Sequence, residues 1–206
     1  MEQKSAEWFQ ARLGKVTASN VDNIIVKVKN GESTYKRRYR MQLVTERLTN
    51  KVVPIFMNSA MAHGVEFEDE ARVKYANKMK LLIGKDVREV GFINHPTIKM
   101  AGASPDGLVG LNGLIEIKCP QPMTHTETLQ TGVIAKKYIH QMQWQMSCVG
   151  KDWCDFVSYH PDFPKEYQLF IKRVERDNDL IGRCEVDVIN FLKEVEDIIK
   201  SIKESN

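Results

Sequence analysis

The 206-residue chain lacks the usual marks of a secreted, membrane-spanning or zinc-ribbon protein. It holds four cysteines, and no two of them form a C-x-x-C pair, which argues against a disulfide framework and against a zinc ribbon. No apolar run approaches the ~18 residues that cross a bilayer, and the charged first residues do not predict a signal peptide. We therefore expect reduced and buried thiols, a cytoplasmic location and no membrane partner.

Two further absences exclude common enzyme classes. The five histidines never occur at the i, i+4 spacing of a helical zinc pair. The glycines between positions 102 and 110 are not followed by the Lys-Ser/Thr of a phosphate-binding loop, and they lack the spacing of a Rossmann fingerprint. Neither a zinc hydrolase nor an enzyme with a nucleotide cofactor is expected.

No internal repeat, low-complexity tract or long linker divides the sequence. A chain of this length buries roughly 70% of its unfolded surface, which is enough for one large domain. We expect a single domain over 1–206, with a helical part at 1–80, a strand-rich core at 81–175 and a packing helix at 179–203. This order of elements predicts an α/β or α+β fold in which helices flank a central mixed β-sheet.

Hydrophobic periodicity and turn residues define the expected elements. The expected helices are 6–13, 17–26, 35–48, 58–80, 127–138, 140–149 and 179–203. The expected strands are an antiparallel meander at 87–93, 98–101, 108–111 and 114–118, followed by 153–159 and 167–174. Thr17 is the expected N-cap of the second helix. Leu48, Val186 and Ile189 are expected on inward-facing helical stripes.

Positive charge gathers near the start of the chain. Residues 1–50 hold ten Lys/Arg and five Asp/Glu, so their balance of +5 exceeds the +3 of the whole chain. The densest run is KRRYR at 36–40, preceded by Lys27 and Lys29. A basic patch with an interleaved aromatic favours binding of phosphate backbones, which makes Lys29 a candidate DNA contact. From charge alone, a solvated helix face is an equally good interpretation.

Three charged residues stand where a turn leads into a strand. Asp106 follows Pro105 at a tight turn, and ten residues later Glu116 and Lys118 project to one face of a strand because side chains alternate. A hairpin through the Asn-Gly pair at 112–113 would bring Asp106 beside them. Two carboxylates with an ammonium nearby suit a hard cation such as Mg²⁺, and the lysine would orient or deprotonate an attacking water.

The bare spacing of these residues is weak evidence, since a D-x(n)-E-x-K pattern is expected about 0.4 times by chance in a chain of this size. The turn and the apolar residues around the Glu-x-Lys strand strengthen it. The alternative is an exposed edge-strand ion pair between Glu116 and Lys118, which would contribute little.

Pro105-Asp106 followed by EIK at 116–118 resembles the active-site signature of the PD-(D/E)xK nuclease superfamily. Longer motifs resemble, in the same order, the phage lambda exonuclease (YqaJ-type viral recombinase) family. They are WFQARLGKVTAS at 8–19, GVEFEDEAR at 64–72, ASPDGL at 103–108, EIKCP at 116–120 and HQMQ at 140–143. The resemblance covers about residues 5–175 and implies a restriction-endonuclease-like core.

The resemblance implies a Mg²⁺-dependent exonuclease, with two ions per site and Mn²⁺ as a substitute. Such enzymes digest one strand of double-stranded DNA from its 5′ end, release mononucleotides and leave a 3′ overhang for a single-strand annealing protein. Family members of this type form a ring-shaped homotrimer around the DNA. A phage or prophage origin and the cytoplasm of a bacterial host would follow.

The motifs also imply roles for individual residues at the metal centre. Asp106 and Glu116 would be metal ligands, joined by the backbone carbonyl of Ile117. Lys118 would serve the nucleophilic water. Glu68 matches the additional acidic residue near a second metal.

Three more residues have implied roles around this centre. Gln141 and Gln143 match a Q-x-Q helix that borders the site. Met61 occupies the place of an apolar wedge that separates the terminal base pair. A methionine at helical spacing is more often a core residue, so both interpretations of Met61 stay open.

A phosphate pocket can be argued from the residues themselves. The guanidinium of Arg12 pairs bidentately with phosphate, and Ser19 lies in the first turn of an expected helix, where free amides favour an anion. The family motif adds Ser104 and implies that these positions bind the 5′ phosphate. The alternative is that Arg12 only stabilises the end of its helix and that Ser19 is a capping-turn hydroxyl.

Two rival functions remain. A structure-specific or restriction-type endonuclease of the same superfamily would cut a closed circle, which an exonuclease leaves intact. A non-catalytic DNA-end adaptor would recruit an annealing protein and would show no carboxylate-dependent metal site.

Overall fold

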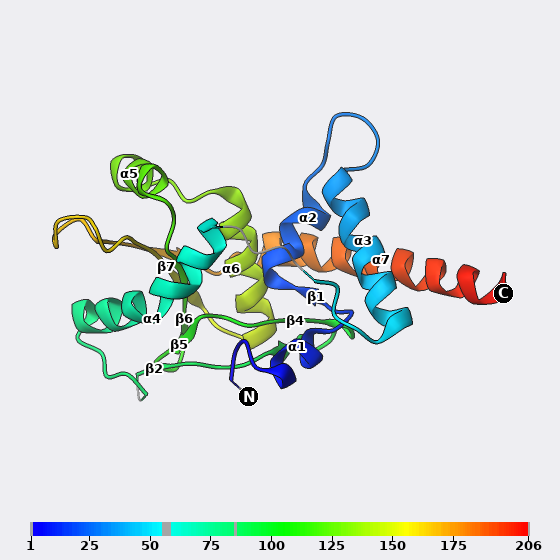
Figure 1. The fold of residues 1–206 in the computed structure, drawn as a ribbon, viewed down its shortest axis with the longest axis horizontal. Coiled ribbons are helices and arrows are strands. Elements are labelled where there is room, and N and C mark those ends of the chain that lie inside the picture. Colours follow the sequence, from blue (N-terminus) through cyan, green and yellow to red (C-terminus); the bar gives the residue numbers. More distant parts are fainter. Residues whose placement is uncertain (1, 55–58, 85, 206) are drawn as a thin grey trace.

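The computed structural model describes residues 2–54, 59–84 and 86–205 (Figure 1). Its helices are α1 (Ala6–Arg12), α2 (Val21–Ile25), α3 (Thr34–Thr49), α4 (Ser59–Met79), α5 (Pro122–Thr131), α6 (Lys136–Val149) and α7 (Asn178–Glu204), with a 3₁₀ helix η1 at Ala18–Asn20. Its strands are β1 (Val16–Thr17), β2 (Val87–Arg88), β3 (Ile93–Asn94), β4 (Ala101–Ala103), β5 (Gly107–Val109), β6 (Gly113–Lys118), β7 (Trp153–Tyr159) and β8 (Leu169–Glu175). The expected mixed fold of helices and strands is confirmed. In these ranges, no helix has both the length and the apolar character needed to span a bilayer.

A five-stranded mixed sheet forms the centre of the molecule, in the order β2-β5-β6-β7-β8. Strands β6 and β7 run parallel, whereas every other neighbouring pair is antiparallel. A parallel pair requires a crossover connection, and α5 and α6 supply it between β6 and β7. The expected central mixed sheet is therefore confirmed.

The expected four-stranded meander is wrong, because its strands divide between two sheets. The run at 87–93 splits into β2, which joins the large sheet, and β3, which joins a three-stranded sheet in the order β1-β4-β3. In the small sheet β4 pairs in parallel with β1, with Val16 opposite Ala101. A segment near the start of the chain thus occupies the edge of β4 at which the next strand of the meander was expected. Periodicity within a strand does not specify such a distant partner.

Helices cover both faces of the large sheet, as the alternation of side chains along β6 requires. Ile115 and Ile117 point to the face covered by α4, where they pack with Ala71 and Tyr75. Leu114 points to the opposite face, where it packs with Met142 and Met146 of α6. The central strand β6 lies between α4 and α6 (Figure 1) and is buried on both sides. Burial on both sides fixes the direction of the side chains that it carries.

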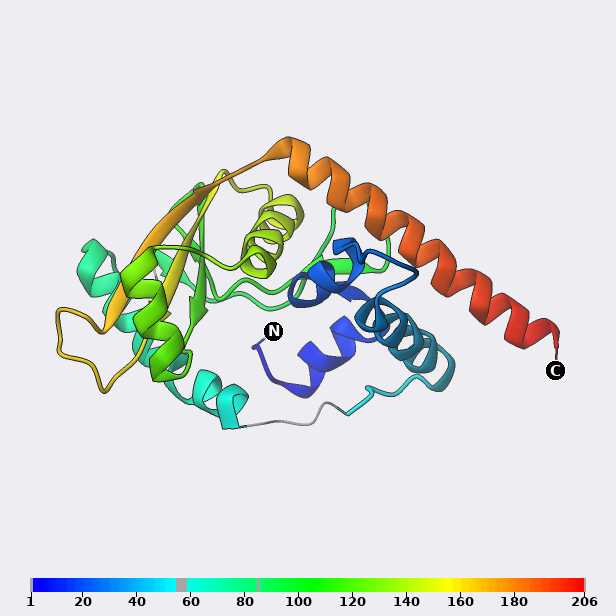
Figure 2. The same ribbon diagram turned by 90° about the horizontal axis from the view of Figure 1, so that it is seen from above.

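A third apolar cluster joins the N-terminal helices to α6 and α7. Tyr39 of α3 stacks on Phe191 of α7 with ring centroids 5.6 Å apart. Three positions expected on inward stripes lie outside this cluster: Leu48, Val186 and Ile189 are 41%, 57% and 51% exposed. The rotation of each helix about its axis is set by the neighbours that it packs against. Figure 2 shows that α7 continues past the rest of the chain at its C-terminal end.

The boundary between the two crossover helices also differs from the prediction. A break was expected near residue 139, whereas α5 ends at Gly132, which adopts the left-handed conformation (φ +62°) that favours glycine. Helix α6 then begins at Lys136, so Tyr138 lies in its first turn.

Candidate active site

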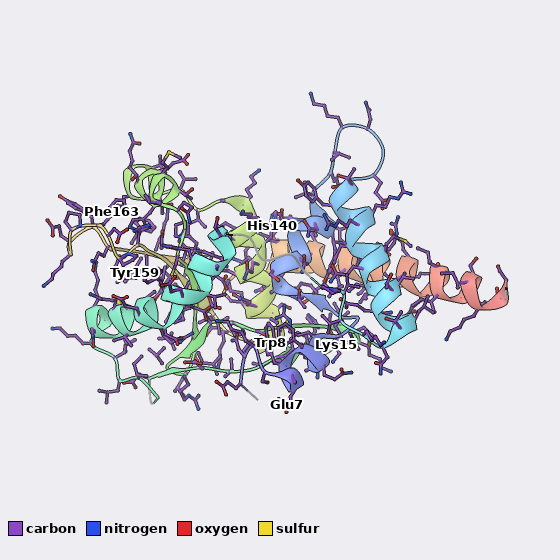
Figure 3. All side chains as sticks on the ribbon, viewed as in Figure 1. Glu7, Trp8, Lys15, His140, Tyr159 and Phe163 are labelled. Carbon is purple, nitrogen blue, oxygen red and sulfur yellow. The ribbon has the colours of Figure 1, made fainter. Side chains whose placement is uncertain are left out.

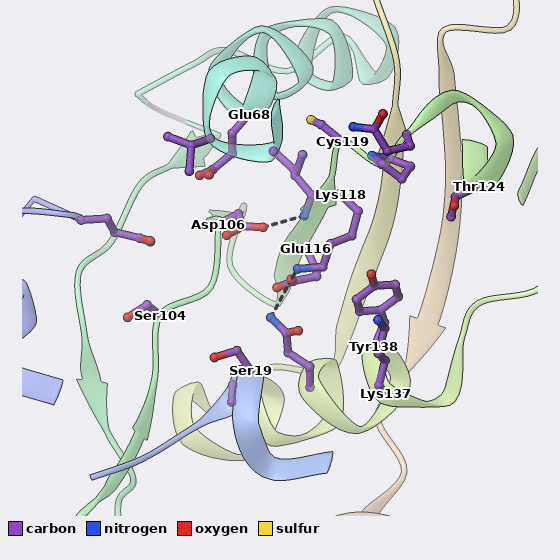
Figure 4. Close-up of a pocket in the computed structure, with 18 of the residues that line it drawn as sticks. Ser19, Glu68, Ser104, Asp106, Glu116, Lys118, Cys119, Thr124, Lys137 and Tyr138 are labelled. Carbon is purple, nitrogen blue, oxygen red and sulfur yellow. Dashed lines mark hydrogen bonds and ion pairs between the residues drawn. The ribbon is translucent and has the colours of Figure 1, made fainter. Parts of the chain in front are cut away.

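The predicted hairpin of β5 and β6 brings Asp106 to Glu116, but its turn lies at 110–112 and not at the expected Asn-Gly pair 112–113, because Gly113 already pairs with Val109. Gly107 pairs with Ile115 across the two antiparallel strands. In this register Oδ2 of Asp106 accepts a hydrogen bond of 2.6 Å from the backbone N–H of Ile117. Figure 4 shows Asp106, Glu116 and Lys118 converging at the same place, so the predicted juxtaposition of the three charged groups is confirmed.

Glu116 is fully buried, and three donors hold its carboxylate. Gln141 donates to Oε1 and Gln145 donates to Oε2, both at 2.6 Å. Lys118 forms an ion pair with the same carboxylate. A buried charge held by several donors has a fixed orientation, so the interpretation of Glu116 and Lys118 as an exposed edge-strand pair is wrong.

The electrostatics of the three groups are strongly coupled. Burial raises the pKa of Asp106 well above its ordinary value, and the neighbouring charge of Glu116 adds to that shift. Burial disfavours the ammonium of Lys118, but the carboxylates of Glu116 and Asp106 outweigh burial and raise its pKa. The lysine is therefore a cation at neutral pH. Ionisation of Asp106 beside Glu116 is therefore disfavoured in the protein alone, and a bound metal cation would stabilise both carboxylates in their charged form.

The donor set fits a hard divalent cation that keeps several waters. The carboxylates of Asp106 and Glu116 line the same cavity as Ile117, whose carbonyl is the third expected ligand. In the part of the chain that the structure describes, no group of three or more His, Cys, Asp or Glu side chains is arranged to hold a metal. Glu68 lines the cavity too, but its carboxylate pairs with Arg72 and Lys4 at 3.0 and 3.1 Å.

Trp8, Arg12 and Ser104 form a second polar group. The indole N–H of Trp8 donates to Oγ of Ser104 at 2.9 Å, and Nη1 of Arg12 approaches the same oxygen at 3.4 Å. The guanidinium carbon of Arg12 lies 3.8 Å from the centroid of the Trp8 ring. Burial lowers the pKa of Arg12 to about 10, so the side chain stays positive at neutral pH. It has no carboxylate within 4.0 Å among residues 2–54, 59–84 and 86–205.

Ser19 lies on η1 and is exposed. The predicted capping by Thr17 is wrong, because its side-chain oxygen accepts a hydrogen bond from the Asn20 side chain and does not cap the following turn. Ser19 nevertheless lines the same cavity as Arg12 and Ser104.

One cavity of about 650 Å³ joins the two polar groups. The sequence-predicted residues that line it are Arg12, Ser19, Glu68, Ser104, Asp106, Glu116, Ile117, Lys118 and Gln141. Figure 4 shows Ser104 and Ser19 on one side of the carboxylates, with Glu68 above them. The cavity therefore combines a wall whose guanidinium and hydroxyl groups suit an anion with a carboxylate centre that suits a cation.

Three predicted residues do not reach the cavity or cannot be placed. Gln143 is buried on the other side of α6, where it donates to the backbone oxygen of Glu175 and accepts from the N–H of Asp177, so its predicted place at the site is wrong. Lys29 lies on the exposed segment between α2 and α3 and does not line the cavity. The side chain of Met61 lies outside the described residues.

Two functional candidates were not predicted. Gln145 holds Glu116 and follows Gln141 by four positions, which places both on one face of α6. Arg72 follows Glu68 by four positions and donates to the backbone oxygen of Asp106 at 3.1 Å. The i, i+4 spacing was the available signal in both cases.

Two further residues from the sequence motifs, Cys119 and His140, lie close to this region. Cys119 was expected to serve packing, and its buried thiol joins the cluster beneath α4, while burial raises its pKa to about 12. His140, labelled in Figure 3, lies where α6 meets α2, because its Nδ1 is 2.6 Å from Oδ1 of Asp22. It does not line the cavity.

Comparison with known proteins agrees with the interpretation of this cavity as a candidate active site. A family model described as the YqaJ-like viral recombinase domain matches residues 7–152. The crystal structure of an alkaline exonuclease (LHK-Exo) from Laribacter hongkongensis is 47% identical, covers 98% of this chain and 97% of its own, and superposes with a TM-score of 0.89. A structure of LHK-Exo in complex with dAMP gives the same identity and a TM-score of 0.90.

Two more distant relatives extend the comparison. A phage-related exonuclease from Haemophilus somnus 129PT is 16% identical, covers 91% of this chain and 96% of its own, and has a TM-score of 0.71, which shows a shared fold. An uncharacterized protein, R354, of Acanthamoeba polyphaga mimivirus is 26% identical over 184 residues. That match covers 83% of this chain but only 31% of the length of the mimivirus protein.

Proposed function

Because the chain belongs to the YqaJ-like viral recombinase domain family, we propose that it is a Mg²⁺-dependent exonuclease that degrades one strand of linear double-stranded DNA from the 5′ end. The observation that carries the proposal is the single cavity shared by Arg12 and Ser104 on one side and by Asp106 and Glu116 on the other. An arginine beside a metal centre suits a phosphate that lies one nucleotide from the bond to be cut. The chain is 47% identical to an alkaline exonuclease that has also been solved with dAMP, a mononucleotide. This similarity supports an exonuclease reaction that releases mononucleotides.

The pocket at Arg12 would hold the terminal 5′ phosphate. The stack on Trp8 and the hydrogen bond to Ser104 orient the guanidinium before any ligand arrives. Pre-orientation lowers the entropy lost on binding, so the phosphate is fixed at a defined distance from the carboxylates. Each cut would then release one nucleotide.

At the carboxylates, the chain supplies positioned charge. A bound Mg²⁺ pair would activate a water and stabilise the leaving oxyanion, with Asp106, Glu116 and the Ile117 carbonyl as ligands. Glu68 would join them if it exchanged its ion pairs with Arg72 and Lys4 for the metal. Lys118, held as a cation, would orient the attacking water and the scissile phosphate.

The basic N-terminal part is the proposed contact for the remaining duplex. Lys36 and Arg40 pair with Glu194 of α7, which leaves Arg37 and Arg38 exposed on α3. Together with Lys27 and Lys29, these exposed cations would line the mouth of a homotrimeric ring. A single-strand annealing protein acting on the 3′ overhang, and the cytoplasm of a bacterial host, complete the proposal.

One experiment tests the main parts together. The purified chain is incubated with Mg²⁺ and with linear duplexes that differ only in 5′ phosphorylation, and a covalently closed circle is the control. We expect release of mononucleotides from linear DNA, faster from phosphorylated ends, and no cutting of the circle. A nicked or linearised circle would support an endonuclease. Absence of cleavage, together with no calorimetric binding of Mg²⁺ or Mn²⁺, would support an inert DNA-end adaptor.

A further inference from the structure

The cavity has a second wall, opposite the phosphate pocket. It is formed by Gln121 and Thr124 at the start of α5 and by Lys137 and Tyr138 in the first turn of α6. In Figure 4, Thr124, Lys137 and Tyr138 lie on one side of Glu116, and Ser104 and Ser19 lie on the other. The carboxylates therefore stand between two polar walls.

Three side chains of the second wall keep their polar groups free of hydrogen bonds and ion pairs with the described residues. Within the described ranges, the Gln121 carboxamide and the Thr124 hydroxyl make no hydrogen bond, and the Lys137 ammonium has no carboxylate within 4.0 Å. In the opposite wall, by contrast, Trp8 donates to Ser104 at 2.9 Å. Donors that face a cavity without protein partners remain available to a ligand.

Lys137 is the cation of this wall. Its Nζ lies 4.8 Å from the centroid of the Tyr138 ring, and Nζ of Lys118 lies 5.1 Å from the same centroid. Lys118 is already paired with Glu116, whereas Lys137 is exposed. Tyr138 is itself held by stacking on Phe156, with centroids 5.7 Å apart. The Tyr138 ring therefore lies beside two ammonium groups. That of Lys118 is paired with Glu116, and that of Lys137 has no carboxylate partner among the described residues.

We propose that Lys137, with Thr124 and Gln121, binds the second internucleotide phosphate of the strand being digested. The inference rests on the proposed function. If the terminal phosphate occupies the Arg12 pocket and the first internucleotide bond lies over the carboxylates, the strand leaves the centre on the side away from Arg12. A lysine suits this phosphodiester because it acts as a point charge that does not require bidentate geometry.

The two walls then hold different molecules after each cut. The released mononucleotide carries no second internucleotide phosphate, so it has no contact with the Lys137 wall. The shortened strand keeps its contact there and presents a new 5′ phosphate. The Lys137 wall thus retains the strand while the product leaves.

The test replaces the second internucleotide phosphate of a 5′-phosphorylated duplex by an uncharged methylphosphonate. Release of the first nucleotide is measured in Mg²⁺ as kcat/KM for the wild-type chain and for Lys137→Ala. The wild type should lose about tenfold on the modified duplex, as expected for one charge-assisted contact. Lys137→Ala should lose about tenfold on the natural duplex and nothing further on the modified one. It should also lower the slope of log K against log salt by about 0.7–0.9.

The adjacent Lys136, exposed and outside the cavity lining, provides the matched control: Lys136→Ala should behave as the wild type on both duplexes. Lys137→Arg should retain most of the sensitivity to the modification. The proposal is overturned if the wild type cuts both duplexes equally, or if Lys137→Ala remains as sensitive as the wild type. Failure of the proposed function appears separately, as a wild-type chain that releases no first nucleotide from the natural duplex.

Discussion

The carboxylate centre and the Arg12 pocket share one cavity but are built in different ways. The centre comes from a single hairpin, in which Asp106 and Lys118 are separated by twelve positions of the chain. The pocket joins Trp8 and Arg12 to Ser104 by contacts that span 96 and 92 positions. The carboxylate centre is therefore encoded locally, whereas the proposed recognition of a DNA end depends on how distant segments pack.

Helix α3 supports the Arg12 pocket through Glu46 and Arg47, which together are called the α3 brace. Oε2 of buried Glu46 accepts from the N–H of Gly14 at 2.8 Å, and Nε of Arg47 donates to the oxygen of the same glycine at 2.8 Å. Gly14 ends the turn after Arg12 with φ +65°, and a Cβ at this position would lie 2.6 Å from the Arg47 side chain. Residues that do not line the cavity thus hold the turn that follows Arg12. Substitutions in the brace should alter end recognition and leave the chemistry intact.

The largest effect is expected at the centre. Lys118→Ala removes the cation beside Glu116, so turnover should fall by about 10²–10⁴-fold. Binding of phosphorylated DNA ends should change little, because Arg12 and Ser104 are untouched. Single-turnover cleavage and equilibrium binding measure the two quantities separately. Turnover close to that of the wild type would refute the role given to Lys118.

A smaller effect is expected from the residue that supports Glu116. Gln145→Ala removes the donor to Oε2, and loss of such a contact typically weakens metal binding about 10–100-fold. Gln143→Ala is the matched control, since Gln143 lies on the same helix but bonds to the Glu175 backbone. Calorimetric titration with Mg²⁺ compares the two variants. Equal weakening by both would mean that Gln145 acts only through the stability of α6.

The preference of the enzyme for phosphorylated over hydroxyl 5′ ends tests the Arg12 pocket. Arg12→Ala should lower the ratio of kcat/KM on phosphorylated ends to kcat/KM on hydroxyl ends by about tenfold or more. The reason is that it removes a charge-assisted contact with the 5′ phosphate. Glu46→Gln, which keeps the shape of the brace and removes its charge, should lower the ratio a few-fold.

Asp155→Asn is the control for stability in this comparison. Asp155 is buried like Glu46, but its carboxylate bonds to Tyr75 and Arg173. These contacts lie on the face of the large sheet opposite to that of Glu116. The variant should lose thermal stability and keep the wild-type ratio. An unchanged ratio in Glu46→Gln would show that α3 does not position Arg12.

The smallest effect concerns the turn that leads into β4 and Ser104. His95 accepts at Nδ1 from the N–H of Ile98 at 3.1 Å, and its Nε2 faces Ser147 and Glu185. Burial lowers the pKa of His95, against the opposing effect of Glu185. The neutral ring is thus favoured in the fold. Its contribution to stability is complete above the unfolded pKa of about 6.5 and is lost as the pH falls toward the lower folded value.

Replacing this ring should change both the stability and its dependence on pH. His95→Gln should lower the Tm at pH 8 by about 2–4 °C, as expected for the loss of one hydrogen bond in a chain of this length. The decline in Tm below pH 6.5 should be shallower than in the wild type. Thermal unfolding monitored between pH 5 and 8 measures both. An unchanged slope would assign the acid sensitivity to His125 and His160, whose pKa values burial also lowers.

Several features could be predicted from short stretches of sequence. The hairpin of β5 and β6 was predicted from turn residues and alternation, although its loop lies at 110–112, where Gly110 has φ +55°, and not at the Asn-Gly pair. The convergence of Asp106 with Glu116 therefore required no distant partner. The stripe of Ala71 and Tyr75 on α4 is likewise a local pattern. In both cases the residues that interact are close in the chain, and the backbone geometry of one element relates them.

By itself, the sequence determined the hairpin that carries Asp106 and Glu116 and the mixed fold around it, because strand alternation and helical period act over a few residues. Only the tertiary structure decided which glutamine reaches Glu116. Successive helical residues turn by about 100°, so Gln141 and Gln145 share a face while Gln143 points away, and the packing of α6 selects the face that meets β6. The meeting of Arg12 with Ser104 also depended on packing, since a contact across 92 positions arises only when both elements join one core.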